Sequence, residues 1–331
     1  MKYRKVGRSG LKISELALGS WLTYGGTVEN ETAKKCMATA IEQGINFIDS
    51  AEIYAKGKAE EVIAEFLKEG TVDRKDLVIS SKVFWPMNDN INRWGLSRKN
   101  IINAIEGTLS RLELDYIDIY YMHRYDYMTP VKETIEVLDD LIHAGKIHYW
   151  GTSVWTAAQL ERANAVAKEL HAHKPIVEQP LYNMLNRYIE LEIMSVTKTH
   201  GMGLTVWSPL AQGLLTGKYN TGIPAGSRGE KSETVQKYLA ESVDKLKQLG
   251  DLAKSLEITT SQLALAWILR RSEISAAIIG ATKPEHVIEN VKASDVELTK
   301  DVLEQIEAIL NNAPEWPLTY KPNEYYLEKM R

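Results

Sequence analysis

The segment LVISSK, residues 77–82, is a short apolar run that ends in a lysine. This pattern is typical of a buried β-strand whose last residue reaches a functional site at the edge of the core. Seven further runs alternate with stretches of helical period: ELALG (15–19), NFID (46–49), YIDIYYMH (116–123), IHYWGTS (147–153), PIVEQ (175–179), LTVWS (204–208) and AAIIG (276–280). Most recur about every 30 residues, the length of a βα unit. No linker divides the chain, so the pattern predicts an α/β fold, a (β/α)8 TIM barrel, in one domain over residues 1–331.

Two predicted N-cap residues support the prediction of helices between these strands. Ser97 and Thr156 each directly precede an amphipathic stretch, and serine and threonine are preferred at helix N-caps. The predicted buried faces are Ile101, Ile102, Ile105, Leu109 and Leu112 in the first, and Leu160, Ala163, Val166, Ala167 and Leu170 in the second. A doubly wound sheet is the alternative, but no Gly-x-Gly-x-x-Gly follows any predicted strand. GLLTGKY (213–219) is one residue short of a P-loop and lacks its Ser/Thr, which argues against nucleotide hydrolysis.

Three features fall outside the eight units. Residues 3–14 predict an N-terminal β-hairpin with its turn at 7–10. The interval between the seventh and eighth strands is extended, and it predicts a Gly/Pro/Ser-rich loop (221–233) and two helices. The segment 311–326 is rich in proline and aromatic residues, and we expect a C-terminal tail that docks on the surface.

Composition narrows the function classes. The formal net charge is −4, which argues against a nucleic-acid-binding surface. The single cysteine, Cys36, falls at a core-facing helical position and excludes an internal disulfide, which fits a cytoplasmic protein. The N-terminal segment has no apolar signal core and no stretch approaches a membrane-spanning length, so we expect neither a signal peptide nor membrane insertion.

Polar residues gather at the predicted C-terminal ends of the strands, where TIM barrels carry their sites. Together with Tyr54, which follows the second strand, three of them form a chemically coherent group: Asp49, Lys82 and His123. A tyrosine pKa is about 10, and we expect Lys82 to lower the pKa of Tyr54 while Asp49 keeps Lys82 charged. His123 can donate a hydrogen bond to a carbonyl oxygen. The group predicts a proton donor and an oxyanion site, suited to carbonyl reduction.

No metal site is expected beside these residues. HAH (171–173) lies at the end of a predicted helix, far from the strand ends. The hydride for a reduction is therefore expected from an organic cofactor.

Long, correctly spaced stretches resemble the aldo-keto reductase family over nearly the whole chain, and within it the subgroup that contains the voltage-gated potassium channel beta subunits. The matching stretches are LGSW (18–21), NFIDSAEIYAKGKAEE (46–61), SSK (80–82), GLSRKNI (95–101), YWGTSVW (149–155), EQPLYNM (178–184), WSPLAQGLLTGKY (207–219) and IGATKPEHVIENV (279–291). The resemblance implies an NADPH-dependent reductase of aldehydes or ketones. Tyr54 would be its general acid, with Lys82 and Asp49 tuning it and His123 orienting the carbonyl.

The beta subunits carry asparagine at the position of His123. The histidine in this chain favours a working reductase, and the alternative is a cofactor-binding regulatory subunit with weak or no turnover. The resemblance leaves both a monomer and a homo-oligomer open.

The resemblance also places NADPH across the strand ends. Trp207 would stack on the nicotinamide ring, and Ser153 and Gln179 would hold its carboxamide. The other implied contacts are Ser20, Trp21 and Asp49 at the nicotinamide ribose, Ser208, Leu210, Gly213 and Lys218 at the pyrophosphate, and Arg228, Gly280, Thr282, His286, Glu289 and Asn290 at the adenine and 2′-phosphate. A loop over 209–233 would close on the cofactor.

Two residues depart from the family's pattern. Val154 stands where many members have an asparagine that binds the carboxamide. His286 stands where many have an arginine that pairs with the 2′-phosphate. NADH therefore remains an alternative cofactor to NADPH, and Arg228 is expected to bind the 2′-phosphate in place of that arginine.

Four aromatic residues on the predicted loops are expected to line the substrate pocket: Tyr24, Trp85, Tyr125 and Trp155. They favour an apolar or aromatic carbonyl compound as the small-molecule substrate. The sequence does not define which carbonyl it is, because pocket loops vary freely on this fold.

Overall fold

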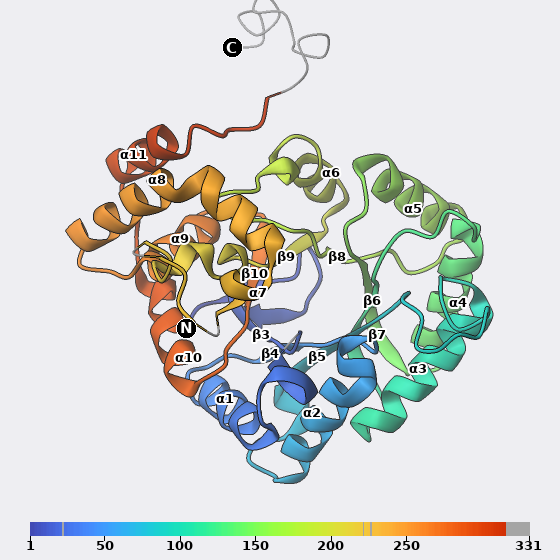
Figure 1. The fold of residues 1–331 in the computed structure, drawn as a ribbon. Coiled ribbons are helices and arrows are strands. Elements are labelled where there is room, and N and C mark those ends of the chain that lie inside the picture. The colour runs from blue at the N-terminus through green and yellow to red at the C-terminus, as the bar shows by residue number, and fades with distance from the viewer. Residues whose placement is uncertain (22, 221, 226, 316–331) are drawn as a thin grey trace, which may run out of the picture.

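The computed structural model describes residues 1–21, 23–220, 222–225 and 227–315. Eight parallel strands close into a barrel in which neighbours along the chain pair, and the last strand pairs with the first (Figure 1). The strands are β3 (Leu16–Gly19), β4 (Phe47–Asp49), β5 (Val78–Val83), β6 (Ile117–Met122), β7 (Ile147–Thr152), β8 (Val177–Glu178), β9 (Gly203–Trp207) and β10 (Ile274–Ile279). All eight predicted strands and the TIM barrel are confirmed.

Helices surround the barrel on its outside (Figure 1). They are α1 (Asn30–Glu42), α2 (Lys58–Lys68), α3 (Arg98–Leu112), α4 (Val131–His143), α5 (Ala157–Glu169), α6 (Ile193–His200), α7 (Arg228–Lys231), α8 (Glu233–Ser255), α9 (Thr260–Leu269), α10 (Pro284–Val291) and α11 (Lys300–Leu310). Both predicted caps are present. The Ser97 side chain accepts a hydrogen bond from the backbone N–H of Asn100, and Thr156 forms a capping box with Gln159.

The predicted helical faces are largely buried. Ile101, Ile105, Leu109 and Leu112 of α3 and Leu160, Ala163 and Ala167 of α5 are buried, whereas Ile102, Val166 and Leu170 are partly buried. The interval before β10 contains α8 and α9, as predicted, and also the four-residue α7.

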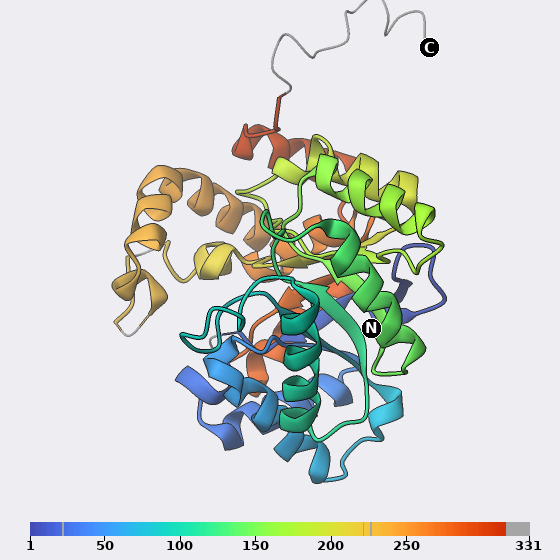
Figure 2. The same ribbon diagram turned by 90° about the vertical axis from the view of Figure 1, so that its right-hand side faces the viewer.

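The barrel interior holds its own apolar cluster, because alternate residues of each strand point inward. The hairpin of β1 (Tyr3–Lys5) and β2 (Lys12–Ser14) contributes Val6 and Ile13 to this cluster, with no exposed surface on either side chain. Its turn passes so close to β9 that a Cβ on Gly7 would lie 2.2 Å from the carbonyl oxygen of Gly201. The predicted hairpin therefore closes the N-terminal end of the barrel. Figure 2 shows it, in dark blue, opposite the α7–α8 segment, in yellow and orange.

A second, larger cluster fills the space between the barrel and the helices, and Cys36 is buried there as predicted. None of the helices in the described part of the chain combines the length and the apolar character that a bilayer crossing requires. Most of the predicted tail over 311–326 lies outside the described residues.

Candidate active site

Alternate residues of a strand point to the same side of the sheet, and this explains why Asp49, Lys82 and His123 lie close together. Asp49 follows the interior residue Phe47 by two positions, and His123 follows Tyr121 by two. Lys82 follows Val78 by four, which keeps it on the same face of β5. Each of these side chains therefore points into the barrel at its C-terminal end.

Asp49 and Lys82 form a buried ion pair. The Lys82 Nζ lies 2.6 Å from Asp49 Oδ2 and donates a second bond of 2.7 Å to the Ser50 carbonyl. The other carboxylate oxygen, Oδ1, accepts bonds from Ser80 Oγ at 2.8 Å and from Gln179 Nε2 at 2.9 Å. Burying a charge is costly unless it is paired and hydrogen-bonded, and both charges here are.

Tyr54 begins a tight turn, η2 (Tyr54–Gly57), in which the next three residues have positive φ. Non-glycine residues rarely adopt this conformation, so Ala55 and Lys56 store strain there. The turn folds Tyr54 back over the strand ends, where its hydroxyl shares a hydrogen bond with Lys82 and its ring centre lies 4.8 Å from Lys82 Nζ. The structure thus brings Asp49, Lys82 and Tyr54 into one contiguous group.

The pKa of Tyr54 reflects two opposing effects. Burial raises it above its usual value, and this effect outweighs the nearby Lys82 ammonium, which lowers it. Lys82 therefore acts in the expected direction, but the pKa is raised overall because the phenolate loses more hydration than one neighbouring cation restores. Tyr54 keeps its proton at neutral pH.

His123 lies on the opposite side of the same pocket. Its ring centre is 5.9 Å from that of Tyr54 and 6.3 Å from that of Trp85. Burial, together with the positive charges of Lys82 and Arg124, holds its pKa well below the usual range, so the imidazole is neutral at pH 7. Among the residues that the structure describes, none offers its buried Nδ1 a hydrogen bond. A ligand oxygen can supply one.

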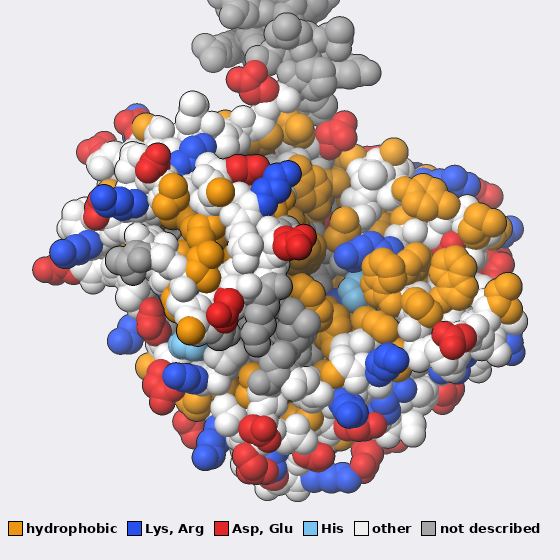
Figure 3. Space-filling view, in the orientation of Figure 1, with side chains coloured by type: hydrophobic (Ala, Val, Ile, Leu, Met, Phe, Trp, Pro, Cys, Tyr) orange, Lys and Arg blue, Asp and Glu red, His pale blue; other side chains and the backbone are white. Residues whose placement is uncertain are grey.

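Of the four expected substrate-pocket residues, Trp85 packs beside His123, and Tyr125 and Trp155 pack against each other. The ring of Trp85 packs at 5.2 Å from that of Phe84, and Tyr125 lies 4.8 Å from Trp155. Trp155 is almost fully buried, whereas Trp85 is 38% exposed. Figure 3 shows a hollow on this face of the molecule with hydrophobic side chains gathered along one rim.

The fourth residue of that set, Tyr24, lies deeper in the molecule. It is only 1% exposed and belongs to the outer core, near Cys36. The turn that carries it, Thr23–Thr27, packs against α2.

The predicted nicotinamide contacts also meet at the strand ends. Ser153 Oγ donates a 2.9 Å bond to the Gln179 carbonyl, and Ser20 Oγ bonds Ser50 Oγ at 3.0 Å. Trp207, at the end of β9, is partly exposed, and Trp21 is 47% exposed.

The segment that follows β9 has an unusual backbone. Ser208, Ala211, Gln212 and Gly213 all have positive φ, and such strained conformations cluster at ligand sites. Lys218 packs over Gly213, so closely that a Cβ there would lie 2.7 Å from its Nζ. Leu210 is partly buried in the same turn.

The predicted adenine contacts lie around the start of α10. Gly280, Thr282 and His286 are exposed, and His286 Nδ1 is 3.4 Å from Thr282 Oγ1. Glu289 is partly exposed, whereas Asn290 is buried. The side chain of Arg228 lies outside the described residues.

With this geometry established, comparison with known proteins decides the family. The profile described as "Aldo/keto reductase family" matches residues 15–311. The chain belongs to the aldo/keto reductase family. It is 41% identical to a probable voltage-gated potassium channel subunit beta from Oryza sativa subsp. japonica, over 97% of this chain and all of that protein. The values are the same for a protein of that description from Arabidopsis thaliana. A putative subunit beta from Schizosaccharomyces pombe is 42% identical over 94% of each chain.

Aldo/keto reductases are oxidoreductases that use a nicotinamide cofactor, and the residues of this chain fit such a group. The indole of Trp207 offers a stacking surface, and the Trp207 backbone N–H donates a 3.0 Å bond to the carbonyl of Pro180, the residue after Gln179. The N-terminus of α10 carries the positive end of the helix dipole, which suits a phosphate, and Lys283 at its N-cap adds a cation.

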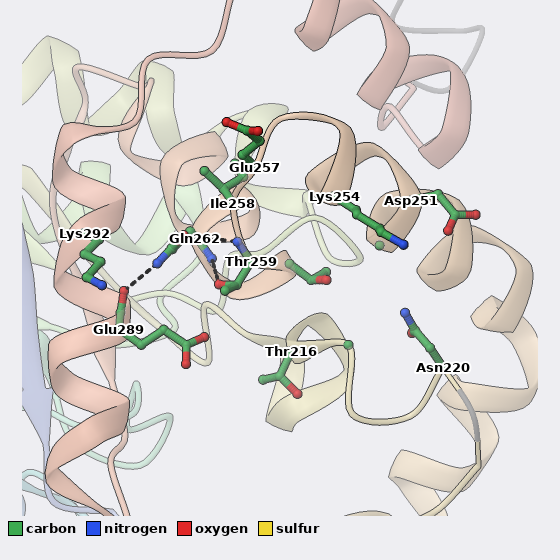
Figure 4. A pocket seen from close by; sticks show the side chains of 13 residues that line it. Thr216, Asn220, Asp251, Lys254, Glu257, Ile258, Thr259, Gln262, Glu289 and Lys292 are labelled. Carbon is green, nitrogen blue, oxygen red and sulfur yellow. Dashed lines mark hydrogen bonds between the residues drawn. The ribbon is translucent and has the colours of Figure 1, made fainter.

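A cavity of about 870 Å³ adjoins Glu289 (Figure 4). It lies among outer helices, between the end of α8, the start of α9 and α10, and Thr216 and Asn220 line its far side. Gln262 Nε2 donates a 3.0 Å bond across it to the Glu289 carbonyl. The cavity is therefore away from the strand ends, where the carbonyl chemistry of an aldo/keto reductase is expected.

Sequence reasoning missed three residues of the site: Ser80, Arg124 and Glu178. Ser80 bonds Asp49, and its spacing of two from Lys82 was a sufficient signal. Glu178 is fully buried and accepts bonds from Thr152 Oγ1 at 2.5 Å and from the Trp155 N–H at 3.2 Å, so it fixes the loop after β7. A carboxylate within the apolar run PIVEQ was its signal. Arg124 directly follows His123.

One cluster with metal-ligand spacing occurs among the described residues: Asp139, His143 and His173. Asp139 Oδ1 lies 2.7 Å from His173 Nδ1 and accepts the His173 N–H at 2.8 Å. The cluster joins the C-terminus of α4 to the segment before β8, at the N-terminal end of the barrel. It is separate from the candidate active site.

Proposed function

We propose that this aldo/keto reductase reduces aldehydes or ketones to alcohols with NADPH, and that Tyr54 is the proton donor. The observation that carries the proposal is the buried group of Asp49, Lys82 and Tyr54, with His123 facing it across the pocket. A protonated phenol and a neutral imidazole at one place suit a carbonyl oxygen that gains negative charge.

Each residue has a separable task. Tyr54 keeps its proton at neutral pH because burial raises its pKa, and Lys82 stabilises the phenolate that remains after the proton leaves. His123 orients the carbonyl oxygen through a ring N–H. Asp49 keeps Lys82 charged and is itself held by Ser80 and Gln179.

NADPH, when bound, supplies the hydride that the carbonyl carbon accepts. Trp207, Ser153 and Gln179 would hold its nicotinamide, with Ser20 and Trp21 at the ribose. Ser208 and Lys218 would bind the pyrophosphate. The preference for NADPH over NADH rests on the cation Lys283 at the N-cap of α10 and on Arg228, and His286 would offer a ring nitrogen to the 2′-phosphate.

A steady-state screen of aldehydes and ketones with both cofactors tests the activity. Tyr54→Phe should lower kcat about 100-fold to 10,000-fold, because it removes the transferred proton. Its Kd for NADPH, from protein fluorescence, should stay near the wild-type value. Tyr127→Phe is the control, because this tyrosine is 81% exposed on the rim. Substantial activity in Tyr54→Phe would show that the proton comes from elsewhere.

The second candidate is a regulatory subunit that binds the cofactor and reports its redox state to a partner. The printed descriptions of the relatives, as potassium channel beta subunits, support it. His123 supports turnover instead, because asparagine is expected at this position in such subunits. NADPH binding without NADPH oxidation across the whole carbonyl panel would favour the subunit.

A further inference from the structure

Arg124 carries a positive charge into the mouth of the candidate pocket. It is partly buried, directly follows His123, and bonds the His123 carbonyl through Nη1 at 2.5 Å. Its guanidinium carbon lies 5.5 Å from the centre of the Trp85 ring. Its charge also acts on both Tyr54 and His123. The guanidinium is therefore close to the place where a carbonyl would react.

This charge has no ion-pair partner within the described residues. Most other shielded arginines contact a carboxylate. Among them are the partly buried Arg4 with Glu15, Arg74 with Asp118 and Arg111 with Glu60, and the buried Arg187 with Glu190. No carboxylate among the described residues lies within 4.0 Å of Arg124. An arginine that loses hydration without gaining a partner is costly, unless a ligand supplies the negative charge.

The nearest acidic group does not take that role. Glu178 uses Oε2 for Thr152 and Oε1 for the Trp155 N–H. Burial raises its pKa to about 7, so it carries only part of a charge at neutral pH. The ammonium of Lys82 is balanced by Asp49 and His123 is neutral, so the Arg124 guanidinium leaves the pocket with a net positive charge that the partly ionised Glu178 does not cancel.

We propose that Arg124 binds an anionic group of the substrate, a carboxylate or a phosphate, while the carbonyl lies between Tyr54 and His123. This inference rests on the proposed function and names its substrate class: short aldehydes or ketones with an acidic group a few bonds from the carbonyl. The planar guanidinium offers two or more N–H donors to such an oxyanion. The Trp85 ring lies 5.5 Å from the Arg124 guanidinium carbon and limits its hydration on one side, which favours pairing with an anion.

Matched substrate pairs test the proposal with the full chain and NADPH. Succinate semialdehyde is compared with butanal, and glyceraldehyde 3-phosphate with glyceraldehyde. We expect kcat/KM to be about 10-fold to 100-fold higher for at least one anionic member, as for hydrogen bonds to charged groups. The pair with the larger ratio identifies carboxylate or phosphate as the bound group. Equal values within both pairs in an active enzyme would overturn the proposal.

Arg124→Gln should collapse this anionic-to-neutral ratio towards one, and Arg124→Lys should restore part of it. Arg98→Gln is the matched control, because Arg98 is an exposed arginine paired with Asp140. A ratio measured within one variant is insensitive to a general loss of stability. An unchanged ratio in Arg124→Gln would refute the assignment to this residue.

An equilibrium measurement separates this inference from the proposed reaction. Butanoate and butanamide are titrated against the chain with NADPH bound, and tryptophan fluorescence is recorded. We expect butanoate to bind about 10-fold more tightly than butanamide, and Arg124→Gln to remove the difference. If no carbonyl is reduced at all, the proposed function fails, but this titration still decides whether Arg124 binds anions. Equal affinities would refute the anion site.

Discussion

At the scale of single residues, Val154 shows how the site stores strain. This β-branched residue has a φ of 58° directly after Ser153, a conformation that asparagine adopts far more readily. Glu178 stabilises the turn by accepting hydrogen bonds from the N–H groups of Val154 and Trp155. The asparagine expected here in many family members thus meets a backbone requirement as well as a carboxamide contact.

Val154→Asn should therefore raise the free energy of unfolding by about 1 kcal/mol, because it removes most of the cost of positive φ. Urea unfolding measures this change, and cofactor titration tests whether the added amide also tightens NADPH binding. Val166→Asn is the comparison. Val166 lies in α5 with ordinary helical φ, where asparagine brings no relief of strain, so this variant should be less stable than the wild type. A less stable Val154→Asn protein would mean that the valine side chain packs better than its backbone strain costs.

Glu52, in the loop between Asp49 and Tyr54, makes stability depend on pH. Burial and then the neighbouring Glu60 raise its pKa from 4.5 to about 8. The folded state therefore holds a proton that the unfolded state has lost, and stability falls as pH rises from 4.5 through 8. Glu52→Gln removes the titration. It should gain on the order of 2 kcal/mol relative to the wild type between about pH 6 and about pH 9.

Unfolding by urea at both pH values checks this expectation. The exposed Glu61→Gln on α2 is the control and should show no such gain. A constant difference between Glu52→Gln and wild type across the window would show that Glu52 is ionised in the folded protein.

At the scale of elements, the turn that carries Tyr54 depends on Gly57. Its φ is 91°, and an added Cβ would lie 2.6 Å from Cδ of Arg111. That side chain cannot move away easily, because its Nε is held at 2.6 Å by the buried Glu60 carboxylate. The turn, the ion pair and the position of Tyr54 are therefore coupled.

Gly57→Ala should lower the free energy of unfolding by about 1 kcal/mol more than Gly70→Ala and should also lower kcat. Gly70 is the matched control, because it has a φ of 69° with no atom within 4 Å of the added Cβ. Denaturant unfolding gives the first quantity and steady-state reduction the second. Equal losses of stability in the two variants would show that Arg111 yields without cost.

At the scale of the whole molecule, the sequence predicts most of the architecture. Alternate residues of each strand are buried in the barrel, and this alternation determines both the strands and which side chains reach the site. The parity that buries Phe47 and Tyr121 in the barrel also directs Asp49 and His123 into its mouth. What depends on packing between distant segments could not be predicted. Tyr24 is buried by a turn against α2, and the sign of the Tyr54 pKa shift follows from a burial that no local pattern encodes.

The N-terminal end of the barrel contributes to stability, whereas the C-terminal end carries the candidate active site. Ile13 of the hairpin is fully buried in the interior cluster at the N-terminal end, opposite the candidate site. Ile13→Ala leaves a cavity and should lower the free energy of unfolding by about 2–5 kcal/mol, measured in urea. Its kcat and KM at a temperature where it stays folded should match the wild type, because the hairpin packs at the end of the barrel opposite the strand ends that hold Asp49, Lys82 and His123. Ile91→Ala, at a site 80% exposed, is the control for stability. A selective fall in kcat for the folded Ile13→Ala protein would show that the hairpin tunes the site through the barrel interior, and that the two ends are not independent.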